Sequence, residues 1–168
     1  MKFFFAIFLL LAGCSISAQK ALTFKEVLKT AKEIVITDSF LIDYSFAEKV
    51  DLDKNTGTSF FKMIERKESD SLQDAGYSIA GKITSHKDFD ILVVGVEKST
   101  RFQYDWLVSD RSITRELFFV LLDKEGNYKN NFLAAMDYRR KDYKKNFTST
   151  ISSQVYADLK IIQHTLNE

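Results

Sequence analysis

The chain has 168 residues and a formal net charge of +1, because 24 Lys and Arg residues are balanced by 23 Asp and Glu residues. This balance excludes the basic surplus that a nucleic-acid-binding domain gathers on one face, so no nucleic acid is expected as a partner. Aromatic residues make up 14% of the chain, which excludes a disordered tail and predicts one packed domain over residues 19–168.

Cysteine and proline usage narrows the possibilities further. The single cysteine is Cys14, and the chain has no proline. The domain that follows can therefore form no internal disulfide and offers no thiol as a metal ligand or nucleophile. Its turns must be made by Gly, Asn and Asp.

The N-terminus predicts a secretory signal. Lys2 precedes an apolar run over residues 3–12, which is about half of the roughly 20 residues that a membrane-spanning helix needs. Residues 1–18 are therefore expected to be an export signal and not a membrane span.

Two cleavage sites are possible at the end of this signal. Leu11-Ala12-Gly13-Cys14 resembles the lipobox of bacterial lipoproteins, which implies cleavage before Cys14, lipidation of its thiol and a lipid anchor in a membrane. Ser15 then resembles the context of outer-membrane lipoproteins, facing the periplasm. The alternative is ordinary cleavage after Ala18, with Ile16 where a smaller residue is usual, which would give a free periplasmic or secreted protein.

The first expected element is an amphipathic helix over residues 23–34. Thr23 and Glu26 have the spacing of a capping box, in which each side chain accepts a hydrogen bond from the other residue's backbone N–H. The following apolar residues recur at helical spacing on one face. Such a helix needs a partner surface.

The rest of the chain is expected to form short strands bounded by polar turns. These strands cover residues 40–46, 59–65, 77–84, 90–97, 102–108, 116–123, 128–138 and 159–166. The last segment also fits a helix face, and a strand is preferred. The clearest hairpin turn is Asp123–Asn127, where Gly126 supplies a positive φ. Further turns are expected at Ser85–Asp88 and Glu97–Arg101.

These elements predict an α+β fold that is mostly antiparallel β. We expect a single meander sheet of roughly six to eight strands, twisted or partly closed, with one N-terminal amphipathic helix packed on it.

The densest basic cluster is the candidate site for an anionic partner. Its members are Arg139, Arg140, Lys141, Lys144 and Lys145, with Tyr138 and Tyr143 between them. The competing interpretation is a charged strand end that discourages edge-to-edge pairing.

Other motifs predict no metal or cofactor. Asp51–Gly57 resembles a calcium loop, but Thr56 replaces the required Gly and Lys62 the bidentate Glu, so a solvated turn is expected. His86 and His164 belong to no metal-binding pattern and are expected at the surface.

Catalytic signatures are equally sparse. No Gly-x-Ser-x-Gly elbow occurs, and the Ser-x-x-Lys spacing at Ser59–Lys62 falls in an expected strand without companion motifs. The carboxylate pairs Asp88 with Asp90 and Asp105 with Asp110 cannot be assigned without geometry. Trp106 fits either an aromatic binding platform or a core position.

Beyond the lipobox, the order of Tyr77–Ile83, Phe89–Val94, Phe119–Gly126 and Ser149–Ile151 is similar to small envelope proteins of gram-negative bacteria. This resemblance carries over no activity and no functional residue.

The leading functional hypothesis is a non-enzymatic binding or interaction module tethered to a membrane through Cys14. Its partner would be an envelope protein or an anionic headgroup. The alternatives are a secreted soluble carrier of an apolar ligand and a carboxylate-based hydrolase.

Overall fold

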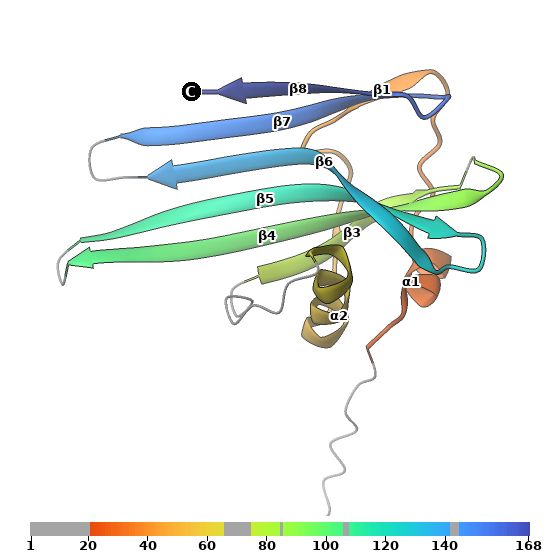
Figure 1. The fold of residues 1–168 in the computed structure, drawn as a ribbon, viewed down its shortest axis with the longest axis horizontal. Coiled ribbons are helices and arrows are strands. Elements are labelled where there is room, and N and C mark those ends of the chain that lie inside the picture. The colour runs from red at the N-terminus through yellow and green to blue at the C-terminus, as the bar shows by residue number, and fades with distance from the viewer. Residues whose placement is uncertain (1–20, 66–74, 85, 106–107, 142–144) are drawn as a thin grey trace, which may run out of the picture.

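A computed structural model describes residues 21–65, 75–84, 86–105, 108–141 and 145–168. Residues 1–18, with the predicted lipidation site Cys14, lie outside this range, as do Trp106 and Lys144. The two helices are α1 (Phe24–Thr30) and α2 (Lys54–Glu65). The strands are β1 (Ser39–Ile42), β2 (Val50–Asp51), β3 (Ala75–Ile83), β4 (Phe89–Asp105), β5 (Val108–Asp123), β6 (Tyr128–Lys141), β7 (Asn146–Tyr156) and β8 (Ile161–Asn167) (Figure 1).

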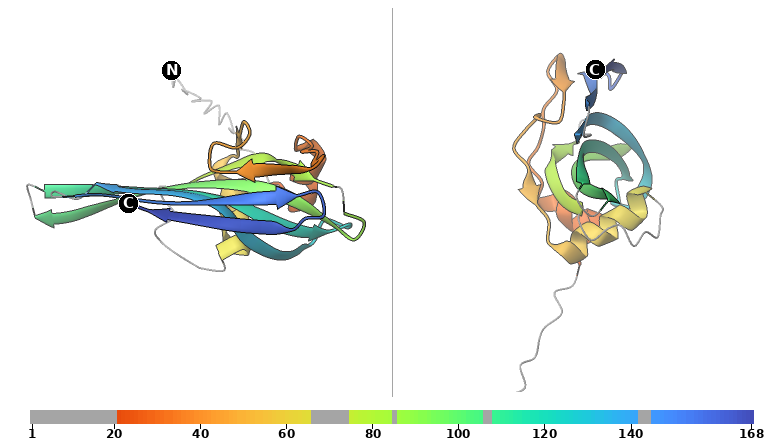
Figure 2. Two further views of the ribbon diagram at one scale, coloured as in Figure 1. Left: turned by 90° about the horizontal axis from the view of Figure 1, so that it is seen from above. Right: turned by 90° about the vertical axis from the view of Figure 1, so that its left-hand side faces the viewer.

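All eight strands belong to one sheet in the order β1-β7-β6-β5-β4-β3-β2, with β8 also paired to β7. Every pair is antiparallel. The sheet curls into a half-barrel, seen end-on in the right-hand view of Figure 2. The predicted class, mostly antiparallel β in one partly closed sheet, is confirmed. Only β1 departs from meander order, because it pairs with β7.

Both faces of the curled part are covered. On one face, Ile91, Val93 and Leu117 pack beneath the segment that contains β1. On the other face, Leu92, Val94 and Val120 pack against α1 and α2. Consecutive residues of β4 are therefore buried on alternate faces, which explains why the central strands are continuous apolar runs.

Helix α1 begins with the predicted capping box. The Thr23 backbone N–H donates to Glu26 Oε2 at 2.7 Å, and the Glu26 N–H donates to Thr23 Oγ1 at 3.3 Å. The helix ends at Thr30 and not at residue 34, because the Ile34 N–H donates to the carbonyl of Lys82 in β3. Pairing with the sheet edge thus replaces the last helical turn.

The prediction of a strand at residues 59–65 is wrong, since α2 occupies this segment. Asp53 starts the helix by accepting hydrogen bonds from the backbone N–H groups of Asn55 and Thr56. Thr56, Phe60 and Ile64 are buried at intervals of four residues, which is a helical stripe. The polar turn expected at Asp51–Gly57 is in part this helix start.

The turn predicted at Glu97–Arg101 is also wrong. Strand β4 runs without a break from Phe89 to Asp105 and pairs with β5 over almost its whole length. Polar residues mark the part of the strand that leaves the core, not its end. The expected strands 90–97 and 102–108 are thus largely one strand, and β5 begins at Val108, well before residue 116.

Other boundaries follow the sequence more closely. The Asp123–Asn127 hairpin is confirmed, with Gly126 at φ +86°. The expected turn at Ser85–Asp88 lies between β3 and β4. The preferred strand over residues 159–166 is confirmed as β8. Strand β1 ends at Ile42, four residues before the expected end, and β7 was not among the predicted strands.

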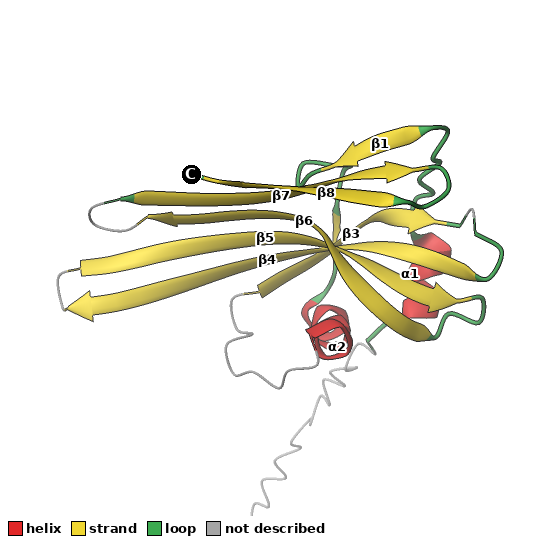
Figure 3. Ribbon diagram, turned by 45° about the horizontal axis from the view of Figure 1, so that its top comes forward, coloured by secondary structure: helices red, strands yellow, loops and turns green. Residues whose placement is uncertain are grey.

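Strands β4 to β7 extend well past the helices (Figures 1 and 3). We call residues 99–105, 108–113, 139–141 and 145–148 the arm. The remaining described residues form the body. The arm lies beyond the pairing of β3 with β4, which ends at Ala75 and Lys98.

Candidate functional site

The predicted basic cluster lies in the arm. Arg139, Arg140 and Lys141 are the last three residues of β6, and Lys145 directly precedes β7. Lys144 lies outside the described residues. Lys141 and Lys145 are exposed, and the Arg139 side chain is 64% exposed. The expected strand-end position is therefore correct for these residues, while binding remains a prediction.

Strand register adds two basic residues to this cluster that sequence reasoning missed. Arg101 of β4 pairs with Arg111 of β5, and Arg111 pairs with Lys141 of β6. Lys141 in turn pairs with Asn146 of β7. We call these four positions the outer row. Only the strand register brings these positions together, and a prediction of β4 and β5 at their full lengths would have revealed the Arg101–Arg111 pair.

Where the arm joins the body, charges are compensated. Arg115 Nε lies 3.0 Å from Glu97 Oε2, and Arg115 Nη1 lies 3.8 Å from Asp137 Oδ2. Arg139 Nε lies 3.1 Å from Asp137 Oδ1. We call Glu97, Arg115 and Asp137 the inner row. It alternates carboxylates and a cation across three strands, an arrangement that stabilises strand pairing.

The outer row has a different charge pattern. Three of its positions are basic, the fourth is Asn146, and none is acidic. Like charges at directly opposite positions of a sheet destabilise it. An anion placed across such a row would offset this repulsion, since guanidinium groups form strong hydrogen bonds to phosphate and carboxylate oxygens.

A cleft of about 460 Å³ lies beneath the loop after β1. Lys49 Nζ donates to the Tyr44 carbonyl at 2.6 Å and lies 4.4 Å from the Tyr44 ring centroid. Burial lowers the pKa of Lys49, and burial together with Glu97 raises the pKa of Tyr44. Because Lys49 is held by its own loop and packs over Gly95, it clamps the loop to the sheet.

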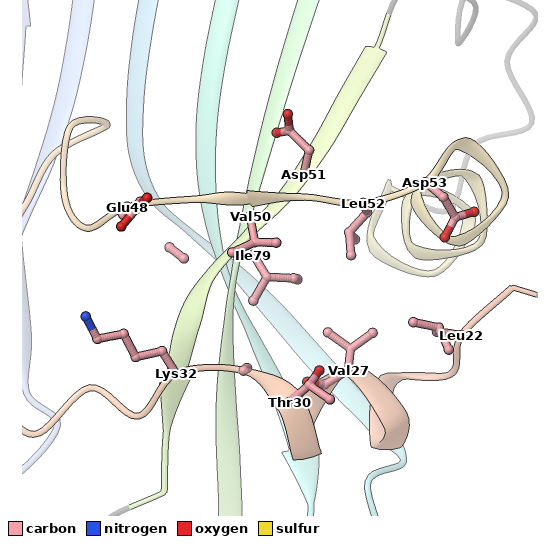
Figure 4. A pocket seen from close by; sticks show the side chains of 12 residues that line it. Leu22, Val27, Thr30, Lys32, Glu48, Val50, Asp51, Leu52, Asp53 and Ile79 are labelled. Carbon is pink, nitrogen blue, oxygen red and sulfur yellow. The ribbon is translucent and has the colours of Figure 1, made fainter.

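A second, more apolar pocket of about 400 Å³ opens between α1, the segment 48–53 and β3. Figure 4 shows the Val27, Leu52 and Ile79 side chains gathered in it, with Lys32 and Glu48 toward one end. A smaller apolar pocket of about 220 Å³ lies on the other face of the sheet. The pocket beside α1 is the larger of these two and is the candidate cavity for the carrier alternative.

Two of the residues considered for catalysis, Asp90 and Ser59, have structural partners. Asp90 is buried and lies 2.7 Å from Lys124 Nζ, while Asp88 is exposed in a turn. The Ser59 hydroxyl donates to the Asn55 carbonyl within α2. The side chains of Asp105 and Asp110 are not described.

The histidines are apart from one another, and the calcium-loop resemblance has a structural explanation. His86 stacks on Phe89 with ring centroids 3.8 Å apart, and His164 is exposed on β8. Hydrogen bonds from Thr56 lower the pKa of Asp53, the residue that caps α2. In the described part of the chain, no three His, Cys, Asp or Glu side chains gather as a metal site would require.

Comparisons with known proteins identify no relative. No family model matches the chain, and neither a curated protein nor a solved structure matches it. Within the described residues, neither helix has the length and apolar character needed to cross a membrane.

Proposed function

We propose that this chain is a non-enzymatic binding module of the bacterial cell envelope, tethered through Cys14, whose arm binds the anionic headgroups of lipids. The observation that carries the proposal is the outer row, in which Arg101, Arg111 and Lys141 are directly paired. A phosphate group across these positions would offset the repulsion between them.

The surroundings of the outer row support a membrane surface as the partner. Residues 138–148 contain five basic residues and one acidic residue. Phe147, which pairs with Arg140, is 44% exposed. Basic side chains near an anionic membrane contribute about 1 kcal/mol each, and an exposed aromatic ring can enter the interfacial region.

The tether and the arm would act together. A lipid on Cys14 would hold the domain at the membrane, so that arm binding becomes an intramolecular event at high effective concentration. A polybasic surface is a common second membrane-binding signal beside a lipid anchor.

The test uses the chain that begins at Gln19, which lacks the tether and keeps every described residue. We would measure its co-sedimentation with vesicles of phosphatidylcholine alone and of phosphatidylcholine mixed with phosphatidylglycerol. The proposal predicts binding to the mixed vesicles only, weakening as salt rises.

Charge reversal localises the effect. The double variant Arg111→Glu, Lys141→Glu is expected to lose at least about tenfold in vesicle affinity, given about 1 kcal/mol for each basic residue removed. The control Lys25→Glu, Lys29→Glu changes net charge equally on the exposed side of α1 and should bind like the parent. Equal losses in both variants, or no binding by the parent, would reject the proposal.

The apolar pocket favours a second candidate function, the carrier of a small apolar ligand. Its volume of about 400 Å³ and its largely apolar lining suit such a ligand. The test is the fluorescence of a naphthalene-type probe, which should fall on replacement of the pocket-lining Ala31 by Leu. Unchanged fluorescence in a folded Ala31→Leu variant would argue against this pocket as the binding site.

A further inference from the structure

Strand β8 forms an edge of the sheet that lacks the usual protection against pairing. Among the described strands it pairs with β7 alone. Its seven residues, Ile161–Asn167, include no proline, lysine, arginine or carboxylate, and its ladder has no bulge. The other strands at the ends of the sheet are short, since β1 has four residues and β2 has two. Natural edges are usually short, charged or bulged, so β8 is a candidate for strand addition.

The backbone groups of β8 that face outward can be assigned. Thr148 and Glu168 exchange both of their backbone hydrogen bonds, and the Tyr156 N–H donates to the Lys160 carbonyl. In an antiparallel ladder such pairs alternate with pairs that point away from the neighbour. Gln163 and Thr165 therefore direct their N–H and C=O groups to the open edge, as do Ile161 and Asn167 at the ends.

The sequence of β8 is self-complementary about its central residue. Ile162 and Leu166 lie two positions on either side of His164 and are 37% and 58% exposed. In an antiparallel pair of two copies centred on His164, each Ile162 lies opposite the other copy's Leu166. Gln163 then lies opposite Thr165 of the second copy.

This register also satisfies the hydrogen-bonding pattern. The four residues whose backbone groups face the open edge in one copy lie opposite the same four residues of the other copy. This gives about eight backbone hydrogen bonds between the two strands. The Ile162 and Leu166 pairs fall at non-hydrogen-bonded positions, where side chains approach most closely. His164 lies opposite its own copy, and no Lys, Arg, Asp or Glu side chain within β8 meets a like charge.

We infer that two copies of this chain pair antiparallel through β8, about a two-fold axis at His164, and so join their half-barrels into one continuous sheet. Self-complementarity selects a second copy as the occupant of the edge. The pairing leaves the outer row of the arm free, because that row ends at Asn146 of β7, outside the ladder between β7 and β8.

The test is analytical ultracentrifugation of the chain beginning at Gln19 over a wide concentration range at neutral pH. We expect a monomer–dimer equilibrium. Thr165→Pro removes an outward N–H without removing a donor to β7, and should raise the dimer dissociation constant by about tenfold or more. Circular dichroism checks that this variant remains folded.

A charge exchange at His164 tests the register without depending on proline. His164→Lys and His164→Glu should each weaken self-association, because like charges meet at the axis. An equimolar mixture of the two variants should recover the parent dimer. A monomer at every concentration, a dimer that Thr165→Pro leaves unchanged, or a mixture no stronger than its components would overturn the inference.

Discussion

The body and the arm are built from the same strands but are stabilised differently. In the body, Leu92, Val93 and Val94 of β4 are completely buried because both faces of the sheet are covered. In the arm, β4 continues with its ladder to β5 but without helices over it. The body therefore depends on burial of apolar surface, and the arm depends on backbone pairing and cross-strand charges.

This difference suggests a division of labour. Burial of both faces fixes the fold but leaves little surface for recognition. In the arm, Arg139, Lys141 and Lys145 are exposed. The strand register aligns Lys141 with Arg111 and Arg101. We therefore expect substitutions in the body to alter stability and substitutions in the arm to alter binding.

The largest expected effect on stability is in the body. Leu92→Ala removes a side chain with 0% exposure and should lower the free energy of unfolding by about 2–5 kcal/mol. Phe147→Ala, at a 44% exposed position of the arm, should cost about 0.5 kcal/mol or less. Urea unfolding measures both variants, and similar losses would remove the distinction between body and arm.

The next largest effect on stability is expected at the point where β6 and β7 separate. Ser153 is fully buried, and its hydroxyl donates to the Ala134 carbonyl at 2.5 Å. Ser153→Ala leaves that carbonyl without this partner and should cost about 1–3 kcal/mol. Thermal unfolding checks the value, with the exposed arm-side Thr150→Ala as control. An unchanged midpoint for Ser153→Ala would mean that this bond does not join the two strands.

A smaller effect on stability is expected at helix α1, which covers one face of the body. Thr23→Ala removes the N-cap of α1 and should cost about 1 kcal/mol, whereas Thr23→Ser should cost little. Chemical unfolding of the two variants gives the comparison. Equal behaviour of the Ala and Ser variants would show that the capping box does not stabilise α1.

The smallest effect concerns the hairpin at the end of β5. A hydrogen bond from Lys129 holds the pKa of Asp123 below its usual range, with a second bond from the Asn127 backbone. A depressed folded-state pKa stabilises the fold above the unfolded pKa, and this contribution is lost as pH falls below about 4. Parent and Asp123→Asn should therefore differ in stability at neutral pH and converge in acid. A constant difference across pH would contradict this assignment.

Local signals predicted much of the fold. The capping box at Thr23 and the Gly126 hairpin depend on contacts within a few residues, so sequence pattern sufficed. The pattern of β8 also fits a helix, and its pairing with β7 decides for a strand. Helix α2 was missed because its stripe of Thr56, Phe60 and Ile64 begins before the window that suggested a strand.

The candidate site was predicted only in part. Arg139, Arg140 and Lys141 are adjacent in the sequence and were found by composition. Arg101 and Arg111 join them through strand pairs between residues 10 and 30 positions apart, which composition does not encode. Polar residues at 97–101 suggested a turn because an uncovered strand has no buried face to produce alternation.

The most direct test of the proposed function is an amide chemical-shift map of the chain beginning at Gln19, titrated with short-chain phosphatidylglycerol. We predict the largest shifts in the arm, at Arg111, Lys141 and Phe147, with little change in α1 and β3. Shifts centred on the apolar pocket at Val27 and Ile79, or shifts absent from the arm, would contradict the account.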